Sequence, residues 1–93
     1  MIKGFKCKAT EALFKGYEPA KHLRPIAKVA RRKLDMINYA DVLGDLRAPP
    51  GNRLEALKGN RRGQHSIRIN EQWRICFVWH PDGADEVEIV DYH

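Results

Sequence analysis

The sequence contains few cysteines, and this scarcity excludes two ways in which small proteins are stabilised. Only Cys7 and Cys76 are cysteines among its 93 residues. They are too few and too far apart for a disulfide scaffold, and they lack the paired spacing of a zinc site. Because free cysteine is among the residue types most often buried, we predict that both are reduced and lie in the core.

Long apolar runs are also missing. The most conspicuous one covers only residues 75–79, far short of the roughly 20 residues that a membrane-spanning helix needs. The first ten residues carry lysines with no apolar segment behind them, so a cleaved secretory signal is not expected. We therefore predict a cytoplasmic protein that has no membrane partner.

The motifs of several large enzyme classes are absent as well. The chain has no G-x-x-x-x-G-K-[ST] phosphate loop, no G-x-S-x-G nucleophile turn, no H-E-x-x-H metal motif and no clustered set of Cys and His ligands. With 43% apolar and 31% charged residues, the composition is that of a globular protein. We predict one domain over residues 1–93, with a site that is shallow or built on its surface.

Charge is plentiful but unevenly distributed. The net charge is +5, yet residues 75–93 carry five acidic and no basic residues, whereas residues 47–74 carry seven basic and two acidic ones. Arginine dominates this middle segment. Because a guanidinium binds phosphate through a rigid fork and stacks on bases, the bias favours an RNA or DNA surface. A solvated, solubilising surface explains the charge equally well. The seven residues are Arg47, Arg53, Lys58, Arg61, Arg62, Arg68 and Arg74.

The first elements are predicted from hydrophobic periodicity and capping residues. Residues 2–7 alternate in part between apolar and polar side chains, which indicates an edge strand. A short helix follows over residues 10–15, with Thr10 as its N-cap and Gly16 as its stop.

A long helix is predicted over residues 22–43, because apolar residues recur there at three- and four-residue spacing. Pro25 fits only in the first turn of this helix, and Gly44 is its expected end. The basic run at residues 31–33 is assigned to the solvent face of the helix, and a direct contact with nucleic acid is the alternative.

The second half is predicted as a meander of antiparallel strands. Its segments are a loop at 44–53, strands at 66–70, 73–79 and 86–92, and tight turns at 70–72 and 81–83. Helices followed by such strands indicate an α+β fold of two layers. The long helix is expected to cover the face that bears Ile67 and Ile75. The opposite face is expected to be open to a ligand and carries Ser66, Arg68, Asn70 and Arg74.

Two groups of residues could support chemistry on RNA. Arg68 and Arg74 flank a hairpin turn, and two like charges on adjacent strands are either screened by solvent or hold an anion. Asp91, Tyr92 and His93 close the sequence, either as a frayed segment or as proton-transferring groups. Cutting RNA by attack of its 2′-hydroxyl on the adjacent phosphate needs a base, an acid and cations. The remaining histidines are predicted to be surface or structural residues; they are His22, His65 and His80.

The motifs L-x-x-L-K-G-x-R-x-G, S-I-R-x-N-x-x-W-R and D-Y-H occur in order, and the chain resembles the HigB group of RelE-like toxins over its whole length. The resemblance implies an α+β fold with two N-terminal helices on one face of a small, mainly antiparallel sheet. It also implies a ribosome-dependent endoribonuclease that cleaves mRNA in the A site without a metal or other cofactor. The implied partner is an antitoxin with a helix-turn-helix domain, and the complex of the two binds operator DNA.

The same resemblance implies roles for individual residues. Lys58 matches a basic active-site position and Arg74 a phosphate-binding arginine, while Arg68 is the nearest candidate for a second arginine that relatives carry at the position of Asn70. Some relatives have a histidine where this chain has Glu55. The implied proton-transfer and base-stacking cluster is Asp91, Tyr92 and His93, and the implied contacts to ribosomal RNA are Arg53, Arg61 and Arg62. A non-catalytic RNA- or ribosome-binding module, or a pure interaction protein, is the alternative.

Overall fold

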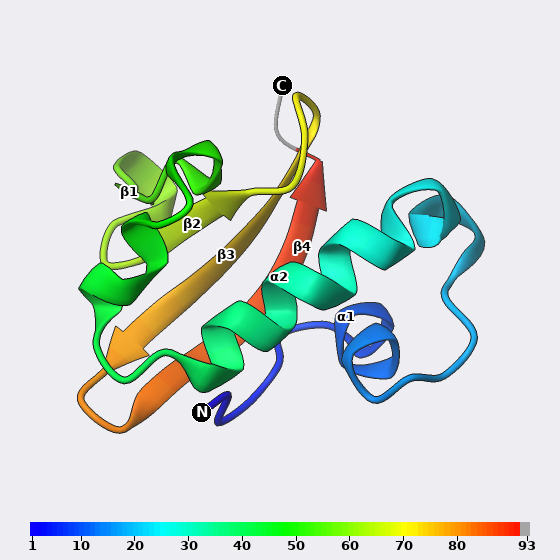
Figure 1. Ribbon diagram of the computed structural model, residues 1–93, viewed down its shortest axis with the longest axis horizontal. Coiled ribbons are helices and arrows are strands. Elements are labelled where there is room, and N and C mark those ends of the chain that lie inside the picture. The colour runs from blue at the N-terminus through cyan, green and yellow to red at the C-terminus, as the bar shows by residue number, and fades with distance from the viewer. Residues whose placement is uncertain (92–93) are drawn as a thin grey trace.

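The computed structural model describes residues 1–91 and has two layers, helices on one side and an antiparallel sheet on the other (Figure 1). The helices are α1 (Lys8–Phe14) and α2 (Ala27–Tyr39), and the strands are β1 (Glu55–Ala56), β2 (His65–Arg68), β3 (Trp73–His80) and β4 (Gly83–Asp91). Four short 3₁₀ helices complete the described part: η1 (Lys21–Ile26), η2 (Leu43–Arg47), η3 (Pro50–Asn52) and η4 (Gly59–Arg61). The predicted α+β class is confirmed.

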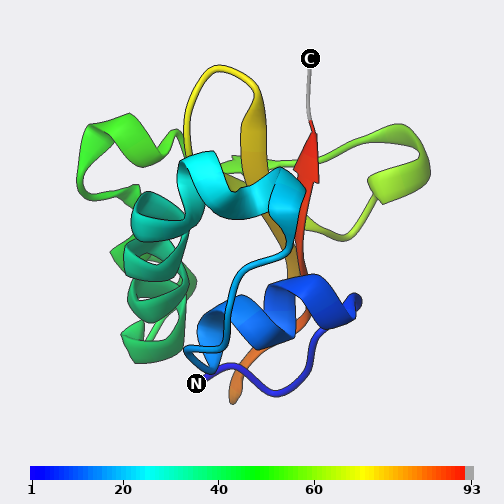
Figure 2. The same ribbon diagram turned by 90° about the vertical axis from the view of Figure 1, so that its right-hand side faces the viewer.

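The core lies between the two helices and one face of the sheet. Ile75 of β3 pairs with Ile67 of β2 and Ile89 of β4, and all three side chains are buried. Leu34 and Ile37 of α2 belong to the same apolar cluster and are fully buried. Burying side chains of this size stabilises the fold by about 1.5–3 kcal/mol each. Figure 2 shows α2 on one side of the sheet and the segment around η4 on the other.

The sheet runs in the order β1-β2-β3-β4, and each neighbouring pair is antiparallel. The predicted strand at residues 2–7 is wrong. Only two isolated parallel bridges form there, between Ile2 and Ala84 and between Phe5 and Val87, along the outer edge of β4. The N-terminal segment therefore covers that edge without forming a strand. The short strand β1, which the sequence did not predict, forms the opposite edge.

Helix α1 begins at Lys8, two residues earlier than predicted. Cys7, not Thr10, is its N-cap, and the Cys7 Sγ accepts a bond from the Thr10 N–H at 3.4 Å. Thr10 lies inside the helix and is fully buried. Its Oγ1 accepts a hydrogen bond of 3.0 Å from the Ile89 N–H in β4. Thr10 thus ties the helix to the sheet. The predicted stop at Gly16 is confirmed, since the chain leaves the helix there with a φ of +88°.

The predicted long helix at 22–43 is wrong at both ends. Residues before Ala27 form the 3₁₀ helix η1, which contains Pro25, so the proline precedes α2 instead of lying in its first turn. At the other end α2 stops at Tyr39, and Gly44 lies inside η2. The Asp45 carboxylate accepts hydrogen bonds from the N–H groups of residues 41 and 42, at 3.0 and 3.3 Å, so the chain begins a new turn there.

The basic run at 31–33 does not form a solvent face, apart from the exposed Arg32. Arg31 donates hydrogen bonds of 2.9 Å to the carbonyls of Leu13 and Tyr17, and so holds the end of α1. Lys33 is 6% exposed and donates to the Asn52 side chain. The helical pattern could not show this, because the segments that cover these residues lie elsewhere in the sequence.

The strand predictions for the second half are confirmed, with β4 beginning three residues earlier than expected at Gly83. The second face of the sheet is less open than predicted, because Ser66 and Cys76 are fully buried on it. Cys76 is thus buried as predicted, while Cys7 is only half-buried at the start of α1. Both are free thiols. Among residues 1–91, no helix has the length and apolar character needed to cross a membrane.

Candidate functional site

The centre of the candidate site is a pair of arginines on the sheet face away from the helices. Arg68 of β2 and Arg74 of β3 are direct cross-strand partners, as the sequence predicted. Like charges placed directly opposite each other repel, so the pairing opposes folding unless an anion neutralises it. Both arginines line a surface pocket of about 360 Å³. The pocket is lined by Arg53, Arg68, Asn70, Glu71 and Arg74.

Arg74 is held from several sides. Its Nε donates to the Ser66 Oγ at 2.8 Å and its Nη2 donates to the Arg53 carbonyl at 2.8 Å. The Glu55 carboxylate lies 3.4 Å from the same Nη2. Only 11% of the Arg74 side chain is exposed. The guanidinium is therefore set in one orientation before any ligand arrives, which reduces the ordering that an anion would have to impose on it.

Arg68 is bound more loosely. Its Nη2 lies 4.0 Å from the carboxylate of Glu71, whose side chain is 95% exposed, and such exposed pairs contribute about 0–1 kcal/mol. An anion can therefore replace Glu71 at little cost. Asn70, where relatives were expected to carry the arginine, holds the hairpin turn instead. Its Oδ1 accepts hydrogen bonds of 2.8 Å from the N–H groups of Gln72 and Trp73.

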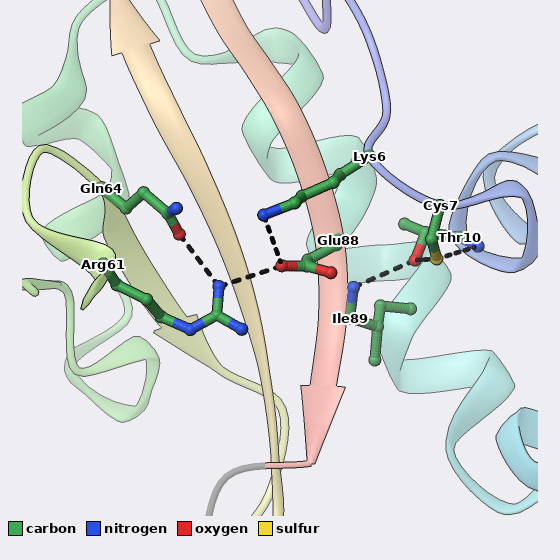
Figure 3. A network of polar contacts seen from close by, with 7 residues as sticks. All are labelled: Lys6, Cys7, Thr10, Arg61, Gln64, Glu88 and Ile89. Atoms are coloured by element: carbon green, nitrogen blue, oxygen red, sulfur yellow. Dashed lines mark hydrogen bonds and ion pairs between the residues drawn. The ribbon is translucent and has the colours of Figure 1, made fainter.

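Arg61 is bound to an acidic residue on the same face. Its Nη1 lies 2.9 Å from the Glu88 carboxylate and 3.1 Å from the Gln64 side chain (Figure 3). Lys6 lies 3.8 Å from the same carboxylate oxygen of Glu88. Two cations thus share one acid whose side chain is 16% exposed. This network joins the η4 segment, β4 and the N-terminal segment, and it gives Arg61 a structural partner in addition to the predicted contact with RNA.

Lys58 and Arg62 are the two residues that flank η4, and both are exposed. Neither lines the arginine pocket. The structure therefore brings together three of the predicted basic residues in one pocket, namely Arg53, Arg68 and Arg74, while the others do not line it.

Asp91 lies at the end of β4, opposite Trp73 of β3. Because paired residues share a face and Trp73 packs against the core, Asp91 lies on the helix side of the sheet, away from Arg74. Its carboxylate accepts a hydrogen bond of 3.1 Å from the Gln72 side chain. The other two members of the predicted cluster, Tyr92 and His93, lie outside the described residues.

The three remaining histidines have the surface or structural positions predicted for them. His22 and His80 are exposed, and the His22 ring lies 6.2 Å from the Trp73 ring. His65 is half-buried and stacks on Phe77 with ring centroids 6.4 Å apart. Within residues 1–91 no group of three or more Cys, His, Asp or Glu side chains gathers in a way that could hold a metal ion.

Sequence reasoning missed the residues that support Arg74. Glu55 was noted only as a departure from relatives, and Ser66 was predicted to be solvent-exposed on the ligand face. Asn52 was assigned to a loop, yet it is fully buried. The strand alternation did place Ser66 on the same face as Arg74, and this was the one available signal.

The same fold occurs in a solved structure. A chain of the solved YoeB-YefM complex from Staphylococcus aureus superposes with a TM-score of 0.60, covering 100% of this chain and 98% of that one, at 16% sequence identity. Residues 3–93 match the family model described as the RelE-like toxin of type II toxin-antitoxin system HigB. This chain belongs to that family, as the motifs in its sequence indicated.

Individual relatives agree with this assignment. The chain is 34% identical to the "Endoribonuclease HigB" of Proteus vulgaris over 94 residues, which cover all of both chains. It is 52% identical to "Toxin HigB-1" of Vibrio cholerae over 62 residues, which are 67% of this chain and 64% of that protein. An uncharacterized protein of Haemophilus influenzae is 46% identical over 52 residues, or 56% of this chain and 52% of the relative. The last two matches span less than two thirds of those relatives.

Proposed function

We propose that this protein is an endoribonuclease that cleaves mRNA on the ribosome and so inhibits translation. The observation that carries the proposal is the directly opposed pair of Arg68 and Arg74 in one surface pocket. An anion with several oxygens, such as a phosphodiester, satisfies two guanidinium groups at once. The name of the P. vulgaris relative, to which this chain is 34% identical over its whole length, supports endoribonuclease activity.

The proposed reaction is internal transfer of the phosphodiester. The 2′-oxygen of one nucleotide attacks the adjacent phosphorus, the bond to the 5′-oxygen of the next nucleotide breaks, and a 2′,3′-cyclic phosphate and a 5′-hydroxyl result. The proton leaves the 2′-hydroxyl for a base, and an acid supplies a proton to the departing 5′-oxygen. Arg74 and Arg68 bind the non-bridging oxygens, where negative charge builds up in the transition state.

The remaining roles follow from the family resemblance. Lys58 contributes positive charge or accepts the 2′-proton, His93 with Asp91 transfers protons, and Tyr92 stacks on a base. In this proposal Asp91 acts only through His93, because Asp91 itself lies on the helix side of the sheet, away from Arg74. Arg53, Arg61 and Arg62 contact ribosomal RNA, a contact that weakens as salt rises. The shallow pocket suits a substrate that the ribosome itself positions.

Membership in a type II family gives the chain an antitoxin partner. In our proposal this antitoxin carries a helix-turn-helix domain, and the complex binds the operator DNA of its own genes. The free toxin acts in the cytoplasm, where translating ribosomes are found.

The test uses ribosomes stalled on a defined mRNA, with cleavage mapped by primer extension and ribosome binding measured by co-sedimentation. Arg74→Ala and His93→Ala should each abolish cleavage and leave ribosome binding nearly intact. The 5′-hydroxyl end of the downstream fragment should accept phosphate from a polynucleotide kinase directly. If the wild-type protein binds ribosomes but never cuts the mRNA, even at high concentration, the protein is a binding module and the proposal is wrong.

A further inference from the structure

Buried polar side chains are rare among the described residues, and one of them bonds directly to Arg74. Within residues 1–91 only four polar or charged residues are buried, namely Thr10, Lys33, Asn52 and Ser66. Taking a polar group out of water costs free energy unless a partner replaces the water. Thr10 joins α1 to β4. Ser66 accepts a hydrogen bond from Arg74. The question is what the buried pair of Lys33 and Asn52 supports.

We propose that Lys33 and Asn52 form a buried positioning pair, which holds the Arg53 carbonyl against Arg74 and thereby orients its guanidinium for the substrate phosphate. The catalytic part of this inference rests on the proposed function. Its structural part, the orientation of Arg74, does not depend on that function.

The first step is the attachment of the loop to α2. Lys33 projects from α2 and donates to the Asn52 Oδ1. The Asn52 Nδ2 in turn donates to the carbonyls of Leu46 and Ala48, at 3.1 and 3.3 Å. Both ends of the amide are therefore occupied. This single fully buried side chain joins the loop at residues 46–52 to the helix.

The second step leads from Asn52 to Arg74. Arg53 directly follows Asn52, and its N–H donates to the Pro50 carbonyl at 3.1 Å. Arg53 has a φ of +46°, a left-handed conformation that is unfavourable for a residue with a side chain. Its carbonyl accepts a hydrogen bond of 2.8 Å from the Arg74 Nη2. A residue in this conformation needs support from its surroundings, and the anchored Asn52 beside it supplies that support.

The choice of lysine at position 33 favours this role over simple packing. Lysine is almost never fully buried unless it is paired, and here it donates to an uncharged amide. A methionine would fill similar space without the cost of a buried charge, but it could not donate to the Asn52 Oδ1. A costly side chain at a position that an apolar one could fill indicates that the hydrogen bond itself is needed.

Lys33→Met is the main test, and Arg32→Met is its matched control. Arg32 is the neighbouring residue of α2, so its substitution removes the same charge from the same helix, but its side chain is exposed. Three properties are measured: thermal unfolding, kcat and KM for cleavage on stalled ribosomes, and water exchange of the Arg74 Nε–H by ¹⁵N NMR. The second variant is Asn52→Asp. It keeps an acceptor oxygen for Lys33 but loses the N–H donors to the carbonyls of Leu46 and Ala48.

We expect Lys33→Met to lower kcat about tenfold with KM within about twofold, because only the orientation of a transition-state contact is lost. The Arg74 Nε–H should exchange faster with water in Lys33→Met and in Asn52→Asp, and should be unchanged in Arg32→Met. Introduced into an Arg74→Lys protein, Lys33→Met should lower kcat no further.

Two results would overturn the inference. One is unchanged exchange of the Arg74 Nε–H in both loop variants. The other is a loss of cleavage in Lys33→Met that is fully explained by a smaller fraction of folded protein. If instead Arg74→Ala keeps full cleavage while the loop variants speed the exchange of Arg74, the positioning pair is real and the proposed catalytic role of Arg74 is wrong.

Discussion

The Glu55 carboxylate lies 3.4 Å from the Arg74 Nη2, so a phosphate that approaches this nitrogen meets an acidic group beside it. The Glu55 side chain is 51% exposed, so solvent screens the pair and its net contribution is at most about 1 kcal/mol. Glu55 is therefore close enough to compete with RNA and weakly enough bound to be displaced. It belongs to β1, the two-residue edge strand that pairs with β2 beside Ser66.

Glu55→Gln should increase affinity for a short single-stranded RNA at low salt by up to about fivefold, because a competing charge disappears. Fluorescence anisotropy of a labelled RNA measures this. Glu71→Gln is the matched control, since Glu71 lies 4.0 Å from Arg68 and is far more exposed, and its effect should be smaller. A fall in affinity for Glu55→Gln would instead show that the carboxylate orients Arg74 for binding.

Stability at alkaline pH should reveal the buried Lys33. Burial, together with the like charges of Arg32 and Arg68, lowers the pKa of Lys33 below its ordinary value of 10.5. Between the folded pKa and 10.5 the unfolded chain binds more protons than the folded one, so stability rises with pH in that interval. Below the folded pKa the penalty for the buried charge is present in full.

The melting temperature of the wild type should therefore rise relative to that of Lys33→Met as the pH is raised from neutral toward 10.5. Thermal scans of both proteins in the same buffers measure the difference. Arg32→Met should show a much smaller trend against the wild type, because it keeps the buried Lys33 and removes only one of the lesser causes of its lowered pKa. A gap that stays constant over the whole range would contradict the burial of a charged Lys33.

Thr10→Val should destabilise the fold by about 1–3 kcal/mol, because the buried Ile89 N–H would lose the acceptor that lies 3.0 Å away. Urea unfolding followed by circular dichroism measures the loss. Thr10→Ser keeps the hydroxyl and should lose clearly less. The Thr10 hydroxyl also lies 3.0 Å from the Cys7 Sγ (Figure 3), so the valine variant should loosen the start of α1 as well. Equal stability of the valine and serine variants would exclude this role for the hydrogen bond.

The two thiols should differ in reactivity. Burial raises the pKa of the fully buried Cys76 thiol, so little thiolate is present and a reagent cannot reach it. Cys7 is half-buried at the start of α1. Brief treatment of the native protein with iodoacetamide should modify Cys7 alone, and the same treatment in denaturant should modify both, as mass spectrometry can show. Modification of native Cys76 at the rate of Cys7 would mean that the second face of the sheet opens readily.

Local patterns predicted the part of the site that depends on neighbours in the sequence. Alternation on both sides of the polar turn at residues 70–72 was enough to place Arg68 opposite Arg74. The same local reasoning failed for Thr10, whose type and position suggested an N-cap. A threonine can donate and accept in several settings, and the partner that decided between them, Ile89, is 79 residues away in the sequence.

The sequence by itself determined the fold class, the hairpin that pairs the two arginines and the family to which the chain belongs. These properties follow from side-chain periodicity, turn residues and short motifs, all of which act within a few residues. Only the tertiary structure decided that Lys33 is buried and that Ser66, Glu55 and the Arg53 carbonyl surround Arg74. Lys33 meets Asn52 across 19 residues, and Arg74 meets Arg53 across 21. Whether a cation lies in solvent or inside the protein depends on which distant segment packs over it, and a local pattern carries no record of that segment.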